Sequence, residues 1–329
     1  MTIYSCFLLY QVVSLGDSMD CTKCGKKAVY AGNGQGYCKE HFLDYFESKV
    51  FRTFRKYNLL SQKDAVCVAA SGGKDSLAVL YMTMKYCKRH NINFFALCID
   101  EGIAGYRDHT VDDLSSFCKE HDIPYKVVSF KVKFGAALDD IREKAMKEYN
   151  KKPCTVCGIL RRALLNRASR EAGATKLVTG HNLDDEAQSY FMNLMQGNMR
   201  HNASLGPISG IQENKHFIPR VKPLYFITEK ETRLFCLLKG FKVNFTECPN
   251  INLSFRAKVR DHINQLEAEQ PGIKQGVVNA FLEILPVLKD NYRNTKPFTY
   301  CKKCGEPSGG EVCNVCRLED ELCLDVQSQ

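Results

Sequence analysis

Apolar residues follow two different spacings through the middle of the chain, and each spacing predicts a different kind of element. Short apolar runs rich in β-branched residues predict buried strands at 63–70, 94–100, 125–130 and 176–180. Apolar residues at helical spacing predict helices at 77–86, 109–121, 135–149 and 158–172, with another after residue 181. The alternation predicts an α/β fold, a doubly wound and mostly parallel sheet that binds ligands at the carboxyl ends of its strands.

The pattern continues downstream, where it separates two isolated cysteines. Thr228–Phe241 has helical spacing and places Cys236 in the core. Phe241–Thr246 is strand-like, and Cys248 follows it just before Pro249-Asn250, which predicts an exposed turn. Cys248 is therefore a candidate functional thiol.

The N-terminal residues are apolar, but they have the features of neither an export signal nor a membrane span. No Lys or Arg precedes the run Ile3–Leu15, and no small-residue cleavage site follows it. A membrane span needs about 20 apolar residues. We expect residues 1–18 to be an extension without a function, with Met19 suited as the native start, and we expect a cytoplasmic protein with no membrane association.

Composition narrows the class of protein. The 44% apolar and 25% charged residues are typical of a globular chain, and 329 residues suit about two domains. The net charge of +9 suits a polyanionic partner. Seventeen cysteines, an odd number, argue against a fully paired secreted framework. In a reducing compartment, clustered cysteines indicate metal ligands or catalytic thiols.

Cysteines gather in paired knuckles at both ends of the chain. The first set is Cys21, Cys24, Cys38 and His41. The second set is Cys301, Cys304, Cys313 and Cys316. Two C-x-x-[CH] pairs can place four ligands around one ion, and thiolates with imidazole favour Zn²⁺. Each set predicts one structural zinc site, which supplies folding free energy to a short module.

The first predicted strand runs directly into a glycine turn and then a helix. The turn consists of Ser71, Gly72, Gly73, Lys74, Asp75 and Ser76. Free backbone N–H groups at a helix N-terminus bind phosphate, so this segment predicts an anion site. The Walker A pattern is absent. The hexapeptide resembles instead the PP-loop of the N-type ATP pyrophosphatases.

A second motif follows the fourth predicted strand. It runs from Thr179 through Gly180, His181, Asp184 and Asp185 to Glu186. Two acidic residues at a strand end suit a hard metal ion such as Mg²⁺. The segment resembles the second nucleotide and Mg²⁺ motif of the same PP-loop proteins. Asp100, at the end of another strand, is expected near the ribose or base of the nucleotide.

A third C-x-x-C pair, Cys154 and Cys157, lies inside the predicted α/β region, with Arg161 and Arg162 one helical turn later. On its own the pair fits a redox couple, a cluster site or half of a zinc site. The ordered set of motifs from Cys21 to about Cys316 resembles the tRNA 2-thiouridine synthetases of the TtuA/NcsA type, which are related to the eukaryotic cytosolic thiouridylase.

This resemblance implies further roles. Cys154, Cys157 and Cys248 would hold a [4Fe-4S] cluster with one open iron. Asp185 would be the catalytic acid of the Asp184–Asp185 pair. Some relatives carry a lysine where this chain has Arg161, and arginine keeps the charge without the option of proton transfer.

The resemblance also implies a reaction. ATP on Ser71–Ser76 would be attacked at its α-phosphorus by O2 of a uridine, the anticodon wobble uridine being favoured, with release of pyrophosphate. Lys74 would offset phosphate charge, and Asp75 with Asp185 would hold Mg²⁺. Sulfide on the open iron, or a cysteine persulfide without a cluster, would then attack C2 and expel AMP.

Partners and domains follow from the same reading. Clusters of basic residues favour a tRNA backbone; they are Arg52, Arg55, Lys56, Arg161, Arg162, Arg167, Arg170, Arg256, Lys258, Arg260, Lys302 and Lys303. The sulfur donor is a ubiquitin-like thiocarboxylate or free sulfide, and relatives form homodimers. The expected division is an extension at 1–18, a zinc finger at 19–47, a catalytic ATP domain at 48–250, a helical region at 251–296, and a zinc ribbon with tail at 297–329.

Three other functions compete with this one. The related TtcA-type 2-thiocytidine synthetases share the PP-loop and the cluster cysteines but lack paired zinc modules. PP-loop amidotransferases and lysidine synthetases activate similar carbonyls without a C-x-x-C beside the ATP site. A non-catalytic zinc-ribbon RNA-binding protein would require Ser71–Ser76 to be vestigial, although the segment is intact.

Overall fold

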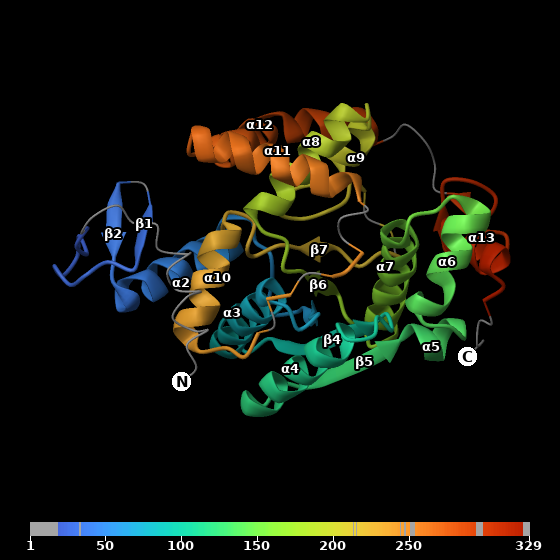
Figure 1. Ribbon diagram of the computed structural model, residues 1–329, viewed down its shortest axis with the longest axis horizontal. Coiled ribbons are helices and arrows are strands. Elements are labelled where there is room, and N and C mark those ends of the chain that lie inside the picture. The colour runs from blue at the N-terminus through green and yellow to red at the C-terminus, as the bar shows by residue number, and fades with distance from the viewer. Residues whose placement is uncertain are drawn as a thin grey trace.

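A five-stranded parallel sheet forms the centre of the molecule (Figure 1). The computed structural model describes residues 19–324, apart from 33, 213, 215, 244, 247, 251–253 and 294–298. The strands are β3 (Ala65–Ala69), β4 (Asn93–Asp100), β5 (Tyr125–Ser129), β6 (Lys176–Val178) and β7 (Arg220–Val221). All four predicted strands are present. Only the two-residue β7, too short to show a period, was not predicted.

The strands lie in the order β5-β4-β3-β6-β7, so the order along the sheet reverses at β3. Val66 of β3 pairs with Phe94 of β4 on one side and with Lys176 of β6 on the other. Ligands of doubly wound sheets bind where the strand order reverses, outside the carboxyl ends. The glycine turn after β3 and the second motif after β6 therefore start at the same place.

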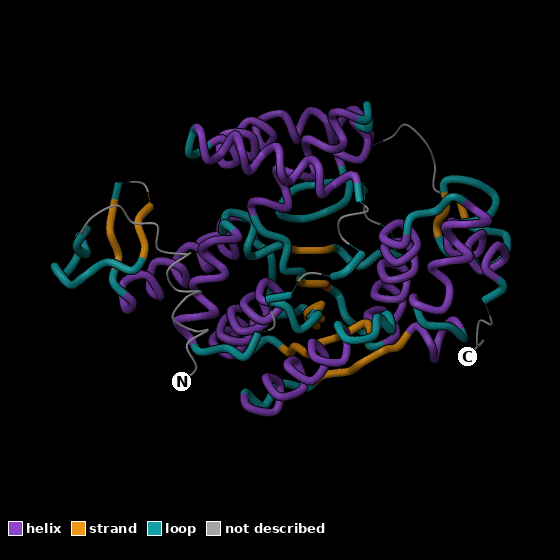
Figure 2. Tube along the Cα trace, in the orientation of Figure 1, coloured by secondary structure: helices purple, strands orange, loops and turns teal. Residues whose placement is uncertain are grey.

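Helices cover both faces of the sheet (Figure 2). Those that precede residue 172 are α2 (Lys39–Lys56), α3 (Lys74–His90), α4 (Arg107–Glu120), α5 (Phe130–Phe134), α6 (Leu138–Tyr149) and α7 (Pro153–Glu171). Those that follow are α8 (Leu183–Met195), α9 (Met199–Ala203), α10 (Glu229–Lys239), α11 (Phe255–Glu269), α12 (Ile273–Arg293) and α13 (Asn314–Leu322).

Alternation along β3 divides the buried residues into two cores. Val66 and Val68 belong to a core with Phe46 of α2 and Phe235 of α10. Cys67, between them, belongs to the opposite core with residues of α5, α6, α7 and α13. Successive side chains of a strand point to opposite faces, so a continuous apolar run predicts a sheet that is covered on both sides. The predicted fold class is confirmed.

Two small modules lie at opposite ends of the long axis in Figure 1. The N-terminal module contains the hairpin of β1 (Tyr30–Gly32) and β2 (Gln35–Tyr37). The C-terminal module contains β8 (Thr299–Tyr300), β9 (Pro307–Ser308) and α13. Within the part of the chain that the structure describes, no helix is long and apolar enough to cross a membrane. The expected extension, residues 1–18, lies outside the described residues.

Two local predictions differ from the structure. The described residues of Phe241–Thr246 form no strand, because this segment packs beside α10 instead of joining the sheet. Helix α7 begins at Pro153 and not at residue 158, so Cys154 and Cys157 lie on its first turns. Proline at the first position of a helix loses no hydrogen bond, which explains the earlier start.

Candidate functional site

The turn after β3 has a backbone that only glycine can adopt. Gly72 has φ +83°, and a Cβ at this position would lie 1.8 Å from the carbonyl oxygen of Thr110. The Ser76 hydroxyl donates to the carbonyl oxygen of Gly73 at 2.8 Å and closes the turn onto α3. The N-terminus of a 17-residue helix therefore faces the carboxyl end of β3, the arrangement that binds phosphate.

A buried arginine supports this turn from α4. The Arg107 guanidinium donates to the carbonyl oxygen of Ser71 at 2.8 Å and pairs with Glu101 at 2.8 Å. Glu101 also accepts from Arg161 at 3.3 Å. Both Arg107 and Glu101 are almost fully buried. Neither was predicted, since an isolated Arg and Glu in a sequence carry no signal of their pairing.

The second motif contacts the turn directly. Gly180 approaches so closely that a Cβ there would lie 2.8 Å from the carbonyl oxygen of Asp75. The Asn182 amide donates to the Asp75 carboxylate at 3.0 Å. The Asn182 side chain also caps α8 by accepting from the Asp185 N–H at 3.0 Å. Asn182 thus contacts both Asp75 and Asp185 and holds these two residues close together.

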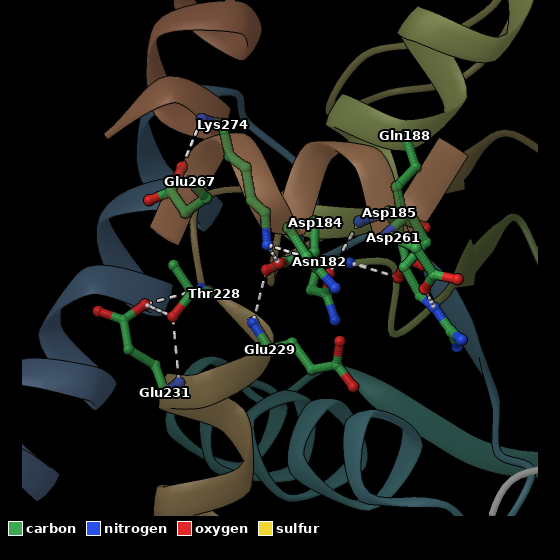
Figure 3. Close-up of polar contacts among 12 residues, drawn as sticks. Asn182, Asp184, Asp185, Gln188, Thr228, Glu229, Glu231, Asp261, Glu267 and Lys274 are labelled. Carbon is green, nitrogen blue, oxygen red and sulfur yellow. Dashed lines mark hydrogen bonds and ion pairs between the residues drawn. The ribbon is translucent and has the colours of Figure 1, made fainter. Parts of the chain in front are cut away.

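The two aspartates of α8, Asp184 and Asp185, have different environments (Figure 3). Asp184 is buried, pairs with Lys274 of α12 and accepts from the N–H of Glu229 at 2.7 Å. Its carboxylate fastens α8 to α10 and α12. Asp185 is partly exposed and lies on the side of Asp75. Of the pair, Asp185 is the one whose carboxylate is open to a ligand.

Charges around Asp185 keep it ionised. Burial alone would raise its pKa, but the Arg256 guanidinium at 2.6 Å and the N–H of Asn182 lower the pKa of Asp185. Burial and the nearby Asp185 charge instead raise the pKa of Asp75, despite its ion pair with Lys74. Two adjacent carboxylates thus have pKa values shifted in opposite directions, a pattern typical of functional sites.

His181 and Lys74 complete this region. Desolvation by nearby atoms, together with positive charges that include Lys222, lowers the pKa of His181, although part of the ring is open to solvent. Lys74 pairs with Asp75 at 2.8 Å and with Glu229 at 2.9 Å. Asp100, expected beside the nucleotide, accepts from the N–H of Gly102 at 2.9 Å and so forms part of the turn after β4.

The structure brings together the three cysteines that the resemblance assigns to a cluster. The thiols of Cys154, Cys157 and Cys248 interact electrostatically with one another, and Cys154 donates to the carbonyl oxygen of Asn250 at 3.1 Å. Burial raises the pKa of Cys154, and it raises the pKa of Cys157 to about 12. A metal site would replace these protons, since thiolates are the ligands of iron–sulfur clusters.

Each terminal set of cysteines has the geometry of a metal site. Within the described ranges, two groups have all their ligand atoms within 4.8 Å of one another, the set of Cys21 and the set of Cys301. The sulfurs of Cys24 and Cys38 are 3.7 Å apart, as are those of Cys304 and Cys313. Tetrahedral zinc–sulfur bonds place sulfurs about 3.8 Å apart.

One thiol in each terminal set is also prepared for ionisation. Burial opposes it at Cys21, but hydrogen bonds from the backbone of Cys38 and Lys23 lower the pKa of Cys21 to about 6. A hydrogen bond from the backbone of Cys313 lowers the pKa of Cys301 to about 6. Both donor sets therefore fit Zn²⁺. The middle cysteines form no such single-ion group in the described part of the chain, and an iron–sulfur cluster is larger than one ion.

Several basic residues expected to face tRNA are paired within the chain. Arg170 pairs with Glu306 and Arg256 with Asp185. Lys302 and Lys303 pair with acidic residues of the C-terminal module. Sequence spacing cannot reveal these partners, because each lies on a different element. Arg161 and Arg162 remain exposed on α7.

Comparisons with known proteins agree with this geometry. The PP-loop domain family matches residues 44–267. The chain is 34% identical to the tRNA 2-thiolation protein NcsA of Haloferax volcanii over 320 residues, which cover 92% of this chain and 99% of that protein. The chain belongs to the PP-loop tRNA 2-thiolation proteins of the NcsA/TtuA type.

Two further relatives show what varies within this family. The tRNA-5-methyluridine(54) 2-sulfurtransferase of Pyrococcus horikoshii is 32% identical, over 88% of this chain and 91% of its own. The structure of the U34-tRNA thiolase NcsA from Methanococcus maripaludis with its [4Fe-4S] cluster is similar with a TM-score of 0.80 and 36% identity, over 95% of this chain and all of that one. The two names place the modified uridine at different tRNA positions.

Proposed function

We propose that this protein is an ATP-dependent tRNA 2-sulfurtransferase that converts a uridine to 2-thiouridine. The contact that carries the proposal is Glu101, which pairs with Arg107 beneath the Ser71 turn and with Arg161 above the Cys157 thiol. One buried carboxylate thus connects the phosphate-binding turn to the three thiols. The proposal places the target base between the turn and the thiols, where ATP and sulfur would approach it from the two sides.

In the first step, O2 of the uridine attacks the α-phosphorus of ATP, and pyrophosphate leaves. The free backbone N–H groups of Ser71–Ser76 bind the phosphates, and Lys74 neutralises charge. Asp75 and Asp185 would hold Mg²⁺, which when bound would offset negative charge on the leaving pyrophosphate. The product is an adenylated base, in which AMP has become a good leaving group.

In the second step, sulfur attacks C2 of the base and AMP leaves. Cys154, Cys157 and Cys248 would hold a [4Fe-4S] cluster, which when bound offers an open iron for sulfide. Arg161 keeps a positive charge beside these thiols and beside the negative charge that develops on the base. Because an arginine does not release its proton, Asp185 is the acid–base group of the site.

The target and the partners are part of the same proposal. We favour the anticodon wobble uridine, because a base in a single-stranded loop can expose its C2 edge. A ubiquitin-like thiocarboxylate or free sulfide supplies sulfur, and the protein works as a homodimer in the cytoplasm. The residues 48–250 carry the chemistry, 251–296 form a helical region, and the modules at 19–47 and 297–329 each hold zinc.

Two assays test the function. Purified protein with Mg²⁺-ATP, sulfide and an unmodified tRNA transcript should release AMP and pyrophosphate only when tRNA is present. Nucleoside mass spectrometry should then detect 2-thiouridine, and mass spectrometry of nuclease fragments should locate it at position 34. Appearance of 2-thiocytidine, or tRNA binding without ATP turnover, would support the competing functions. Asp185→Asn should abolish turnover while ATP still binds.

The cluster needs a separate test. Anaerobic purification followed by iron and sulfide analysis should find about four of each per chain. Cys154→Ser should lose both, whereas Cys236→Ser, which alters a buried core thiol, should retain them. A fully active protein free of iron would favour a persulfide on the same cysteines.

A further inference from the structure

Two cavities meet beside α7 and together form one groove. The first, of about 550 Å³, lies between α7 and the C-terminal zinc module. The second, of about 1380 Å³, extends from there to His181, which is next to the proposed active site. Asn166, Phe217 and Arg220 line both cavities. We call the combined space the α7–ribbon groove. It leads from the reaction centre to the zinc module.

The groove is positively charged and has little internal compensation. Four arginines line its first cavity, namely Arg162, Arg167, Arg220 and Arg317. Among the residues that the structure describes, no carboxylate forms an ion pair with Arg162 or Arg220. Burial and the neighbouring charges of Arg162 and Arg161 lower the pKa of Arg220 to about 10. The carboxylate of Glu306 is already paired with Arg170. Such a surface is suited to a polyanion.

An aromatic ring stands at the junction of the two cavities. Phe217 is half exposed, although its backbone is held firmly. The buried Asn166 side chain donates to the carbonyl oxygen of His216 at 2.7 Å and accepts from the N–H of Ile218 at 3.1 Å. Both neighbours of Phe217 are thus fixed to α7 by one amide. A rigid, exposed ring beside arginines suits a stacked base better than an acidic peptide.

We propose that the α7–ribbon groove binds single-stranded RNA next to the target base. Arg162 and Arg220 contact backbone phosphates, and Phe217 stacks on a base that flanks the target. This assignment rests on the proposed function and adds to it the surface that holds the substrate strand. It also gives the C-terminal module a place in recognition, since its residues form one wall of the groove.

Salt dependence of binding tests the phosphate contacts. Affinity for an unmodified tRNA transcript is measured between 50 and 300 mM salt for the full-length protein, Arg220→Met, Arg220→Lys and the control Lys147→Ala. Lys147 is 76% exposed on α6, away from the groove. Arg220→Met should weaken binding and reduce the slope of log affinity against log salt by about one. Arg220→Lys should restore the slope, and Lys147→Ala should match wild type.

Substitutions of Phe217 test whether its ring stacks on a base. Phe217→Ala should weaken tRNA binding about tenfold, the effect of one lost stacked base, whereas Phe217→Tyr should bind like wild type. ATP affinity, measured by calorimetry without tRNA, should be equal in all variants and thereby show that each is folded.

Two results would overturn the assignment. The first is that Phe217→Ala and Arg220→Met both bind tRNA with the affinity and salt slope of the wild-type protein, while the wild-type protein thiolates tRNA. This result would exclude the groove as the RNA site and leave the proposed function standing. Failure of the wild-type protein to bind or thiolate tRNA would instead contradict the proposed function itself.

Discussion

The guanidinium of Arg256 lies 2.6 Å from the carboxylate of Asp185 and also donates to the Asp185 carbonyl oxygen at 3.2 Å. A second donor of Arg256, its Nε, contacts Gln188 at 3.0 Å, one turn further along α8. Helix α11 thus reaches Asp185, the proposed acid–base group, through a single side chain. The residue is an internal partner of the site and not a free contact for tRNA.

Removing this partner should change the pH dependence of the reaction. Arg256 lowers the pKa of Asp185, so Arg256→Met should raise that pKa towards its usual value. The acid limb of a single-turnover rate profile, where Asp185 becomes protonated, should then move to higher pH. The acid limb of Arg256→Lys should lie between those of the wild type and Arg256→Met, because lysine keeps the charge but loses the two-pronged contact. An unchanged limb in Arg256→Met would show that Asp185 does not limit the rate.

Alanine at Gly72 should abolish nucleotide binding. The added Cβ would collide with the Thr110 carbonyl oxygen, which is backbone and cannot yield without moving α4. Gly105 is the matched control, because it also has positive φ but nothing lies within 4 Å of its Cβ position. Gly105→Ala should cost about 1 kcal/mol in the free energy of unfolding and leave ATP affinity intact. Calorimetry with ATP and thermal unfolding together distinguish the two variants.

Neutralising Glu101 should break the charge contacts that link the Ser71–Ser76 turn, through Arg107, to Arg161 beside the thiols. Glu101→Gln keeps the shape but leaves two guanidiniums without their shared carboxylate, and breaking a buried pair in this way costs about 3–5 kcal/mol. We expect a lower unfolding midpoint in urea and a higher KM for ATP. The exposed pair of Glu143 and Lys147 provides the control, since Glu143→Gln should change neither quantity. A Glu101→Gln protein as stable as wild type would contradict the shared-carboxylate role.

The C-terminal module should depend on its metal. Cys301→Ser should reduce bound zinc from two ions to one per chain, and limited proteolysis should then cut near residue 299. Cys323→Ser in the same module should keep both ions, because Cys323 is exposed and outside the ligand set. Full zinc content in Cys301→Ser would exclude the assigned ligands.

Sequence patterns predicted the sheet, both cysteine sets and the phosphate-binding turn, because each of these depends on local spacing. Local spacing alone did not distinguish Asp184 from Asp185, and only the family resemblance favoured Asp185, since the structural difference arises from Lys274, ninety positions away on α12. Sequence patterns also placed Arg256 among the RNA-binding residues, because its partner Asp185 lies on another helix. The described residues of 241–246 do not form the expected strand, because β-propensity does not reveal whether a neighbouring strand edge is available. Burial among distant elements decided each of these cases.

The shared carboxylate of Glu101 has one further consequence. Glu101 and the nearby Asp100 carboxylate balance the buried charge of Arg107, whereas the Arg161 side chain is half exposed. Part of the Arg161 charge therefore stays open to an anion between the phosphate-binding turn and the thiols. In the proposed reaction the phosphate of an adenylated base is such an anion, and Arg161 would hold it between activation and sulfur transfer.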